Sequence, residues 1–222
     1  MKPPFRIKIC GVTRPADAAL AAEAGADAIG LNFYAKSPRY VSLDQAAAIA
    51  AALPAGVKRV GVFVNADPAE IRRLASQVPL DLVQLHGDEK PEIVESLAGL
   101  ALVRAFRCHA GQIDHVKAWI DEARRRGADL RAALIDAYHP TEYGGTGKTA
   151  DWSLLDKLRA AGVDLPLVLA GGLTSDNVAE AIRIARPDAI DTASGVEAGP
   201  GVKDDEKVRA FVRNATLGLG AV

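Results

Sequence analysis

Short apolar runs rich in valine, isoleucine and leucine alternate along this chain with longer segments rich in alanine, glutamate and arginine. The alternation predicts parallel strands joined by helices, because parallel strands need a crossover of roughly a dozen residues or more. Eight strand-plus-helix units share the 222 residues. Each unit then has about 25 residues, which is near the minimum for such a repeat. The expected strands are Arg6 to Cys10, Ala28 to Phe33, Lys58 to Val64, Leu82 to His86, Leu102 to Arg107, Ala132 to Ala137, Leu165 to Ala170 and Ala189 to Ser194. The expected helices begin near Pro15, Leu43, Pro68, Lys90, Gln112, Trp152, Ser175 and Asp204.

The positions of the glycine-rich segments favour a closed barrel over an open sheet. These segments follow the sixth, seventh and eighth expected strands. An open doubly wound sheet usually has fewer strands and carries its ligand signature after the first one. A (β/α)8 TIM barrel binds ligands at the C-terminal ends of its strands, often with phosphate after strands seven and eight. No linker divides the chain, so we expect residues 1–222 to form a single α/β domain, a (β/α)8 barrel; an open sheet with the same element order is the alternative.

Local signals mark several helix ends. Prolines at 15, 68 and 91 suit the first helical turn, where a missing N–H costs nothing. Asp67 and the run Thr174-Ser175-Asp176 offer N-cap side chains, and Ala-Gly pairs at 24–25 and 161–162 suit helix C-termini.

Charge and composition exclude several kinds of partner. A formal net charge of −1 provides no basic field for nucleic acid, and no apolar run approaches a membrane span. The first residues lack the apolar core of a secretory signal. Two cysteines, Cys10 and Cys108, are too few for a disulfide framework or a zinc site. We therefore expect a metal-free cytoplasmic protein whose partner is a small molecule, with no nucleic acid and no membrane.

Two glycine-rich segments predict a phosphate site. Gly171-Gly172 follows the seventh expected strand, and Ser194-Gly195 follows the eighth. Glycine lets backbone N–H groups approach an anion, and a helix starting near Thr174 or Ser175 would add its positive end. Tight turns between strands and helices are the structural alternative for either pair alone. A third stretch, 199–202, is expected to fold over the site before the last helix.

The segment Gly144-Gly145-Thr146-Gly147-Lys148-Thr149 resembles a nucleotide P-loop only at its end. The glycine that this motif needs five residues before Gly147 is replaced by Glu142. A dinucleotide-binding spacing also fails, because no acidic residue ends the following strand. We interpret this segment as a mobile active-site loop.

Cys10 is the candidate general base. Alternation along the first strand places Ile7 and Ile9 on one face and Lys8 and Cys10 on the other. Cys10 then points into the barrel mouth with Lys8 one layer below, and the cation is expected to favour the thiolate. Inert packing is the alternative for a lone cysteine in an apolar strand.

Asp136 is the candidate general acid. It ends an otherwise apolar sixth strand, where a carboxylate is costly unless it is paired or used in chemistry. Strands one and six are not neighbours in an eight-strand ring, so Cys10 and Asp136 should face each other across the mouth. This arrangement suits general acid–base catalysis on a substrate held between them. A helix-capping or loop-anchoring aspartate is the alternative.

Further candidates surround the mouth. Arg39, just beyond strand two, could bind a substrate carboxylate in bidentate fashion, or could be an ordinary surface arginine. Gln84 and His86 share the inward face of strand four. His86 is expected to position substrate or to pack, and a second general acid or base is the alternative. Asp191 is expected to be a structural or electrostatic neighbour, and Cys108 to be structural.

Motifs along nearly the whole chain resemble the phosphoribosylanthranilate isomerase family of tryptophan biosynthesis. This chain has an alanine, Ala150, where the family usually has an aromatic residue, and Ala193-Ser194 where it usually has two serines. The matching segments, in order, are Lys8-Ile9-Cys10-Gly11, Phe33-Tyr34-Ala35-Lys36-Ser37-Pro38-Arg39-Tyr40, Gly61-Val62-Phe63-Val64-Asn65, Val83-Gln84-Leu85-His86-Gly87, Gly144-Gly145-Thr146-Gly147 with Asp151-Trp152, Leu169-Ala170-Gly171-Gly172-Leu173 and Ser194-Gly195-Val196-Glu197.

The resemblance implies an Amadori rearrangement of N-(5-phosphoribosyl)anthranilate that needs no cofactor. It implies Asp136 as acid, Cys10 as base and Arg39 as the anthranilate carboxylate site, with Gly172, Ser194 and Gly195 holding phosphate. The family contains monomers and homodimers, so either state is expected. The alternatives are a histidine-pathway barrel isomerase, which typically ends strand one in a carboxylate, and a non-catalytic phosphate-binding barrel.

Overall fold

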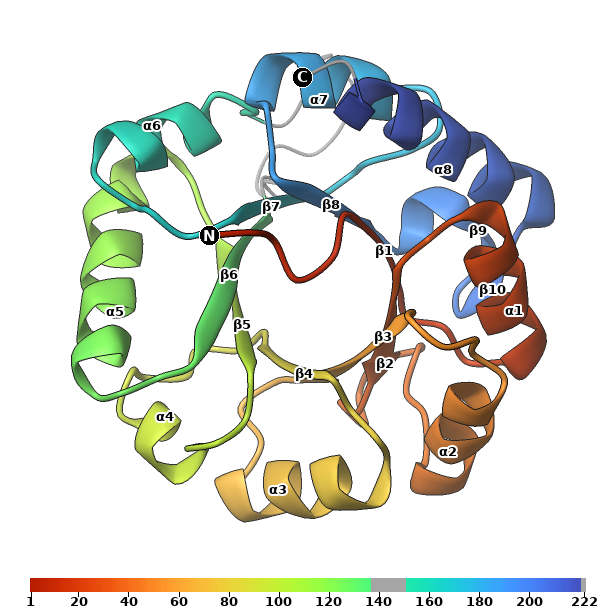
Figure 1. Ribbon diagram of the computed structural model, residues 1–222, viewed down its shortest axis with the longest axis horizontal. Coiled ribbons are helices and arrows are strands. Elements are labelled where there is room, and N and C mark those ends of the chain that lie inside the picture. The colour runs from red at the N-terminus through yellow and green to blue at the C-terminus, as the bar shows by residue number, and fades with distance from the viewer. Residues whose placement is uncertain (137–150, 221–222) are drawn as a thin grey trace.

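A computed structural model describes residues 1–136 and 151–220. Within these residues, eight parallel strands hydrogen-bond in sequence order and close into a barrel, which the helices surround (Figure 1). The (β/α)8 barrel expected from the sequence is thereby confirmed. The strands are β1 (Ile7–Cys10), β2 (Ala28–Asn32), β3 (Lys58–Phe63), β4 (Leu82–Leu85), β5 (Leu102–Arg107), β6 (Leu130–Asp136), β7 (Leu167–Ala170) and β8 (Ala189–Thr192). The α-helices are α1 (Pro15–Ala24), α2 (Leu43–Ala51), α3 (Pro68–Gln77), α4 (Ile93–Ser96), α5 (Ile113–Arg125), α6 (Leu154–Ala160), α7 (Val178–Ala185) and α8 (Asp205–Gly220).

Alternation along the strands divides the apolar side chains into two layers. One cluster fills the barrel interior and includes Val60, Val103 and Leu134, with Phe5 of the N-terminal segment. Figure 1 shows that segment crossing one end of the barrel. The larger cluster, which includes Ile7 and Ile9, packs between the strands and the helices. The interior is therefore solid at this end, and the site must lie at the other.

The local signals at α1 and α3 are confirmed. Both helices start at the expected prolines, and the Asp67 carboxylate accepts a hydrogen bond from the Ala69 N–H. At the end of α1, the Gly25 N–H donates to the carbonyls of Ala21 and Ala22.

Other element ends differ from the sequence prediction by one to three residues. The helix expected from Ser175 begins at Val178, and Thr174-Ser175-Asp176 forms a loop in which the Asn177 side chain accepts the Thr174 N–H. The helix expected from Lys90 begins at Ile93 and has only four residues. Most expected strands end within two residues of the observed bounds. Ala137 and the segment 144–150 lie outside the described residues.

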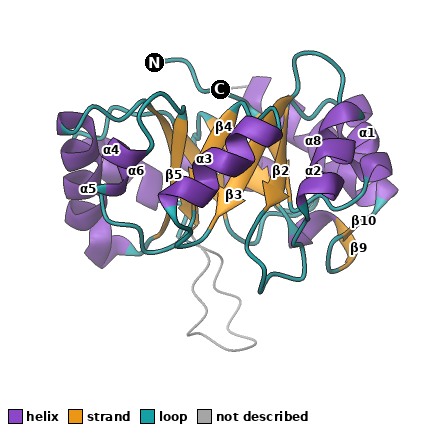
Figure 2. Ribbon diagram, turned by 90° about the horizontal axis from the view of Figure 1, so that it is seen from below, coloured by secondary structure: helices purple, strands orange, loops and turns teal. Residues whose placement is uncertain are grey.

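A short hairpin joins β8 to α8 at the C-terminal side of the barrel. It consists of β9 (Glu197–Gly199) and β10 (Val202–Lys203), and Figure 2 shows it beside α1 and α8. The Thr13 hydroxyl donates to the Gly201 carbonyl at 2.6 Å, which fixes the hairpin against the loop after β1. The expectation that 199–202 fold over the site is wrong, because none of these residues lines the pocket described below.

The last helix, α8, closes the ring of helices. Its buried face includes Val208, Phe211, Val212 and Ala215, and it packs against α1 and α7. Of the helices in the described residues, none is both long and apolar enough to span a membrane.

Candidate active site

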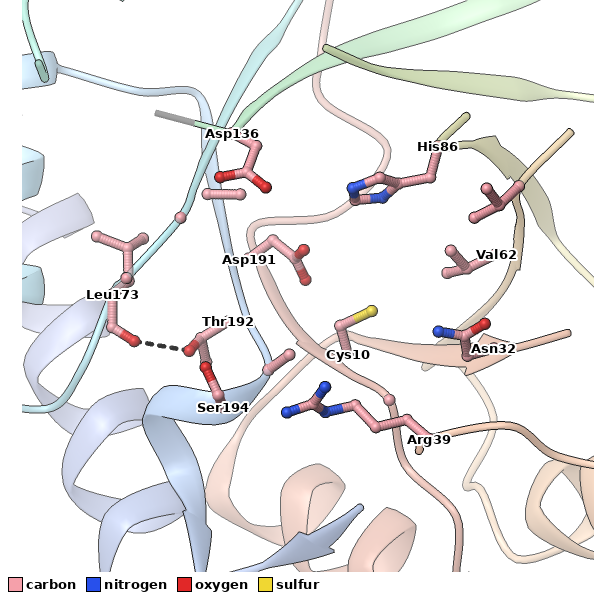
Figure 3. Close-up of a pocket in the computed structure, with 16 residues that line it drawn as sticks. Cys10, Asn32, Arg39, Val62, His86, Asp136, Leu173, Asp191, Thr192 and Ser194 are labelled. Atoms are coloured by element: carbon pink, nitrogen blue, oxygen red, sulfur yellow. Dashed lines mark hydrogen bonds between the residues drawn. The ribbon is translucent and has the colours of Figure 1, made fainter. Parts of the chain in front are cut away.

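A pocket of about 520 Å³ opens where the strands end, and β1 to β4 and β6 to β8, with the loops that follow them, contribute its lining (Figure 3). Most of the site residues predicted from the sequence line this pocket. Gly195 and Gln84 do not: Gly195 is the next residue after the lining residue Ser194, and Gln84 is buried beneath the pocket. The lining residues are Cys10, Gly11, Asn32, Arg39, Val62, Val64, His86, Asp136, Ala170, Gly171, Gly172, Leu173, Asp191, Thr192, Ala193 and Ser194.

Cys10 ends β1 with its thiol in the pocket, above a buried ion pair. The Lys8 Nζ donates to the Asp191 Oδ1 at 2.9 Å, and the Lys8 side chain is fully buried. Burial alone would lower the pKa of Lys8, but the neighbouring Asp191 and Cys10 outweigh it and raise that pKa. Lys8 therefore stays a cation under the thiol. The inward direction of Lys8 and Cys10, expected from strand alternation, is confirmed.

The pKa of Cys10 differs from the sequence expectation. Burial raises this pKa above that of an ordinary thiol, and the Lys8 ammonium lowers it without cancelling the rise. The expected effect of Lys8 is present, but desolvation is larger. Asp191 also opposes the thiolate, and burial raises the pKa of Asp191 itself. Cys10 is thus a thiol that ionises only under more alkaline conditions than an ordinary cysteine.

The space for Cys10 comes from Gly30 on the neighbouring strand. A Cβ at Gly30 would lie 2.7 Å from the Cys10 Sγ and 3.0 Å from the Cys10 Cα. A side chain there would force the thiol out of its position.

His86 follows β4 and faces into the pocket as a neutral imidazole. Burial, together with the charges of Lys8, Arg107 and Arg104, lowers the pKa of His86 to about 4. The Gln84 Nε2 lies 2.7 Å from the His86 Nδ1. With the Gln84 amide in this orientation, its nitrogen donates to Nδ1, and the matching tautomer carries the ring proton on Nε2. The structure thus places Gln84 beneath His86, fully buried, instead of in the pocket lining.

Asp136 is the last residue of β6 and is partly buried at the pocket wall. Its backbone is fixed by pairing with Arg107 of β5 and Ala170 of β7. Figure 3 shows its carboxylate pointing into the pocket that Cys10 also enters. A carboxylate and a thiol thus reach the same space from non-adjacent strands.

The loops after β7 and β8 form one surface of the pocket. Gly172 has a φ of 67°, a conformation that favours glycine, and of the described residues none accepts a hydrogen bond from its N–H. The Thr192 hydroxyl donates to the Leu173 carbonyl at 2.7 Å and ties the two loops together. A Cβ at Gly195 would lie 1.9 Å from that same carbonyl oxygen. These loops can therefore approach only because glycine is present, and they offer backbone donors to an anion.

Arg39 reaches the pocket from the loop after β2. Its Nε and Nη2 donate to the two carboxylate oxygens of Glu197 at 2.8 and 2.6 Å. This bidentate pair fixes the plane of the guanidinium and leaves Nη1 as its remaining nitrogen. A carboxylate ligand in the pocket would meet a guanidinium that is already oriented.

Sequence reasoning missed several residues of this region. Glu197 and Lys203 are buried charges, and Asn32 and Val62 line the pocket. Alternation could have shown that Asn32 and Val62 point inward, since they pair in register on β2 and β3. No local pattern marks Glu197 and Lys203. Among the described residues, no group of three or more His, Cys, Asp or Glu side chains is arranged to hold a metal.

The fold and the pocket define a (β/α)8-barrel protein whose pocket is lined by glycine-rich loops after β7 and β8, and by a thiol and a carboxylate at the ends of β1 and β6. Residues 7–214 match the family model described as N-(5'phosphoribosyl)anthranilate (PRA) isomerase. The chain belongs to this family.

Individual proteins similar to this chain carry the name of the same family. The N-(5'-phosphoribosyl)anthranilate isomerase of Azotobacter vinelandii is 49% identical over 208 residues, covering 94% of this chain and 96% of the relative. The crystal structure of phosphoribosyl anthranilate isomerase from Thermotoga maritima superposes with a TM-score of 0.82 at 43% identity, covering 96% of this chain and 98% of that one. A further crystal structure of this isomerase holds reduced 1-(o-carboxyphenylamino)-1-deoxyribulose 5-phosphate; its TM-score is 0.79 at 40% identity, with coverage of 96% and 98%.

Proposed function

We propose that this chain isomerises N-(5-phosphoribosyl)anthranilate to 1-(2-carboxyphenylamino)-1-deoxyribulose 5-phosphate, a step of tryptophan biosynthesis. The observation that carries the proposal is the composition of one pocket. A thiol, a carboxylate, an oriented guanidinium and two glycine-rich loops all open into it. The substrate has two anionic ends with a sugar between them, which matches this arrangement.

The two anionic ends of the substrate bind to different hydrogen-bond donors, one to backbone N–H groups and the other to a guanidinium. The phosphate takes the backbone N–H groups of Gly172, Ser194 and Gly195, with Gly171 forming the turn. The anthranilate carboxylate takes the Arg39 guanidinium, which Glu197 holds in plane. Fixing both ends leaves the ribose between Cys10 and Asp136.

Asp136 acts first, as the general acid. It protonates the ribose ring oxygen, the bond from that oxygen to C1 breaks, and the nitrogen lone pair forms the C1=N bond of an iminium. The sugar is then open and its C2 proton is acidified.

Cys10 acts second, as the general base. Its thiolate removes the C2 proton, the C2 electron pair forms C1=C2, and the C1=N pair returns to nitrogen to give an enolamine. Loss of the enol proton and protonation of C1 give the ketone. C2 is oxidised and C1 is reduced, so the reaction needs no cofactor.

His86 supports the reaction as a donor. With its pKa near 4 the ring is neutral at physiological pH, and Gln84 fixes the proton on Nε2. A neutral N–H can hold a sugar hydroxyl without exchanging a proton with it. Gln84 therefore serves the substrate through His86.

Several organisational features belong to the same proposal. Residues 1–222 act as one barrel domain in the cytoplasm, as a monomer or homodimer, and the partner is a small phosphorylated molecule. Neither nucleic acid nor metal takes part.

Complementation tests the function in a cell. A tryptophan-requiring strain that lacks this isomerase should grow without tryptophan when it expresses the chain, and should fail to grow with the Cys10→Ala variant. Failure of the unaltered, well-expressed chain to restore growth counts against the proposal.

A further inference from the structure

The hairpin β9–β10 carries two buried charges, Glu197 and Lys203, that do not line the pocket. The Lys203 side chain has no exposed surface. Its Nζ donates to the Cys10 carbonyl at 2.7 Å, to the Ala193 carbonyl at 3.0 Å and to the Glu197 Oε1 at 2.9 Å. An ammonium has three N–H donors, and here each has an acceptor. One cation thus joins the end of β1 to the loop after β8.

Glu197 extends this network to a third part of the site. Besides Lys203, its carboxylate accepts both Arg39 bonds and the Gly201 N–H at 3.3 Å. Burial alone would raise the pKa of Glu197, but Arg39 and Lys203 outweigh it and lower that pKa. The carboxylate is therefore charged and links the two cations.

We propose that Lys203 is a positioning residue that fixes Cys10, the phosphate loop at Ala193 and, through Glu197, the Arg39 guanidinium relative to one another. The proposal rests on the proposed function, because it assigns these three parts to base, phosphate and carboxylate binding. Lys203 itself touches no substrate.

Positioning of the site residues explains this hydrogen-bond network better than a contribution to the stability of the fold does. A buried ion pair often stabilises a fold no more than apolar residues of similar volume would. By contrast, a displacement of about 1 Å in an active site can cost about 100-fold in rate. Lys203 bonds the carbonyls of Cys10 and Ala193, each one residue beyond the last β1–β8 pair, Ile9 and Thr192, so its loss removes the bonds that hold the two chains where the strand ladder has ended.

Lys203 also acts on the Cys10 thiol through its charge. Its ammonium lowers the pKa of Cys10, as Lys8 does from below, whereas Asp191 of β8 raises it. Arg39 also interacts electrostatically with the thiol from the loop after β2. Removing Lys203 takes away one of these cations.

The first test measures Cys10 without relying on isomerase activity. The rate of Cys10 alkylation by iodoacetamide is followed against pH by intact-protein mass spectrometry, in a Cys108→Ala background. Lys203→Met should move the midpoint upward, because the ammonium that lowers the pKa of Cys10 is gone. Lys207→Met is the matched control, since Lys207 donates to the Glu197 backbone carbonyl and not to the site. Equal midpoints in Lys203→Met, Lys207→Met and the parent overturn the proposal.

The second test separates geometry from charge. Lys203→Arg keeps the charge but cannot reproduce three bonds from one nitrogen. Its alkylation midpoint should stay near that of the parent, while kcat/KM falls about 10- to 100-fold. Full turnover in Lys203→Arg, or an equal loss in Lys207→Met, contradicts a positioning role.

A third variant guards against simple misfolding. Lys203→Met combined with Glu197→Gln leaves no unpaired buried charge at these two positions. If circular dichroism shows it folded, inorganic phosphate should still bind more weakly than to Lys207→Met, as measured by calorimetry; unchanged binding overturns the proposal. If the parent lacks isomerase activity, the proposed function fails, but alkylation and phosphate binding still report on the network.

Discussion

The neutral state of His86 makes stability depend on pH in a way that can be calculated. Its pKa is about 4 in the folded protein, against an ordinary value of 6.5. Between these values the unfolded chain binds a proton that the folded chain does not, so the free energy of unfolding rises with pH. One pKa unit corresponds to about 1.4 kcal/mol. From about pH 4.5 to about pH 7, His86 should therefore contribute an increase of about 2 kcal/mol.

The perturbation is His86→Asn, in which the Asn Oδ1 can replace Nδ1 as acceptor for the Gln84 amide. Urea unfolding, followed by the fluorescence of Trp119 and Trp152, gives the free energy of unfolding at each pH. The variant should lose about 2 kcal/mol of the increase seen in the parent. His115→Asn, at an exposed histidine of α5, is the control. Parallel pH dependences of the free energy of unfolding in the parent and His86→Asn would show that His86 is not neutral through its burial in the folded protein.

Three further predictions concern the reaction. Cys10→Ala and Asp136→Asn should each lower kcat by about 10² to 10⁴-fold with unchanged circular dichroism, as expected for loss of a general acid or base; near-normal turnover in either removes that residue from its role. Because burial raises the pKa of Cys10, the thiolate forms only as pH rises through that value, and kcat/KM should increase above neutral pH. A profile that is flat or falls there contradicts the base assignment. Gly195→Ala should lower kcat/KM by about 100-fold, because its Cβ would meet the Leu173 carbonyl oxygen at 1.9 Å, while Gly199→Ala, with nothing within 4 Å, should change little.

The sequence predicted those parts of the fold that depend on local pattern. Alternation along β1 separated Ile9 from Cys10 correctly, because a strand directs successive side chains to opposite faces. Asp67 before Pro68 located the start of α3, since a cap and its helix are neighbours in the chain.

Features that depend on distant residues were not predictable. Glu89, just before the helix expected from Lys90, binds the N–H groups of Asn65 and Gly87 and the Arg104 guanidinium, and the helix itself begins only at Ile93. No local sequence pattern around Glu89 predicts these hydrogen-bond partners.

The site residues also divide into those that a local sequence pattern predicts and those that depend on distant parts of the chain. Cys10 and Asp136 could be found because each interrupts or ends an apolar strand. The Arg39–Glu197 pair joins residues far apart in the chain, and the Cys10 pKa depends on how completely the barrel removes water. Both require the folded structure.

The most direct test of the central claim is to incubate the purified chain with freshly prepared N-(5-phosphoribosyl)anthranilate and follow the sugar by proton NMR. We expect the C1 signal of the aldose to disappear and the C1 methylene of the ketose to appear, without added cofactor or metal. In Cys10→Ala the conversion should be slower by orders of magnitude. A folded, substrate-binding chain that leaves the aldose unchanged would show that the protein is not this isomerase.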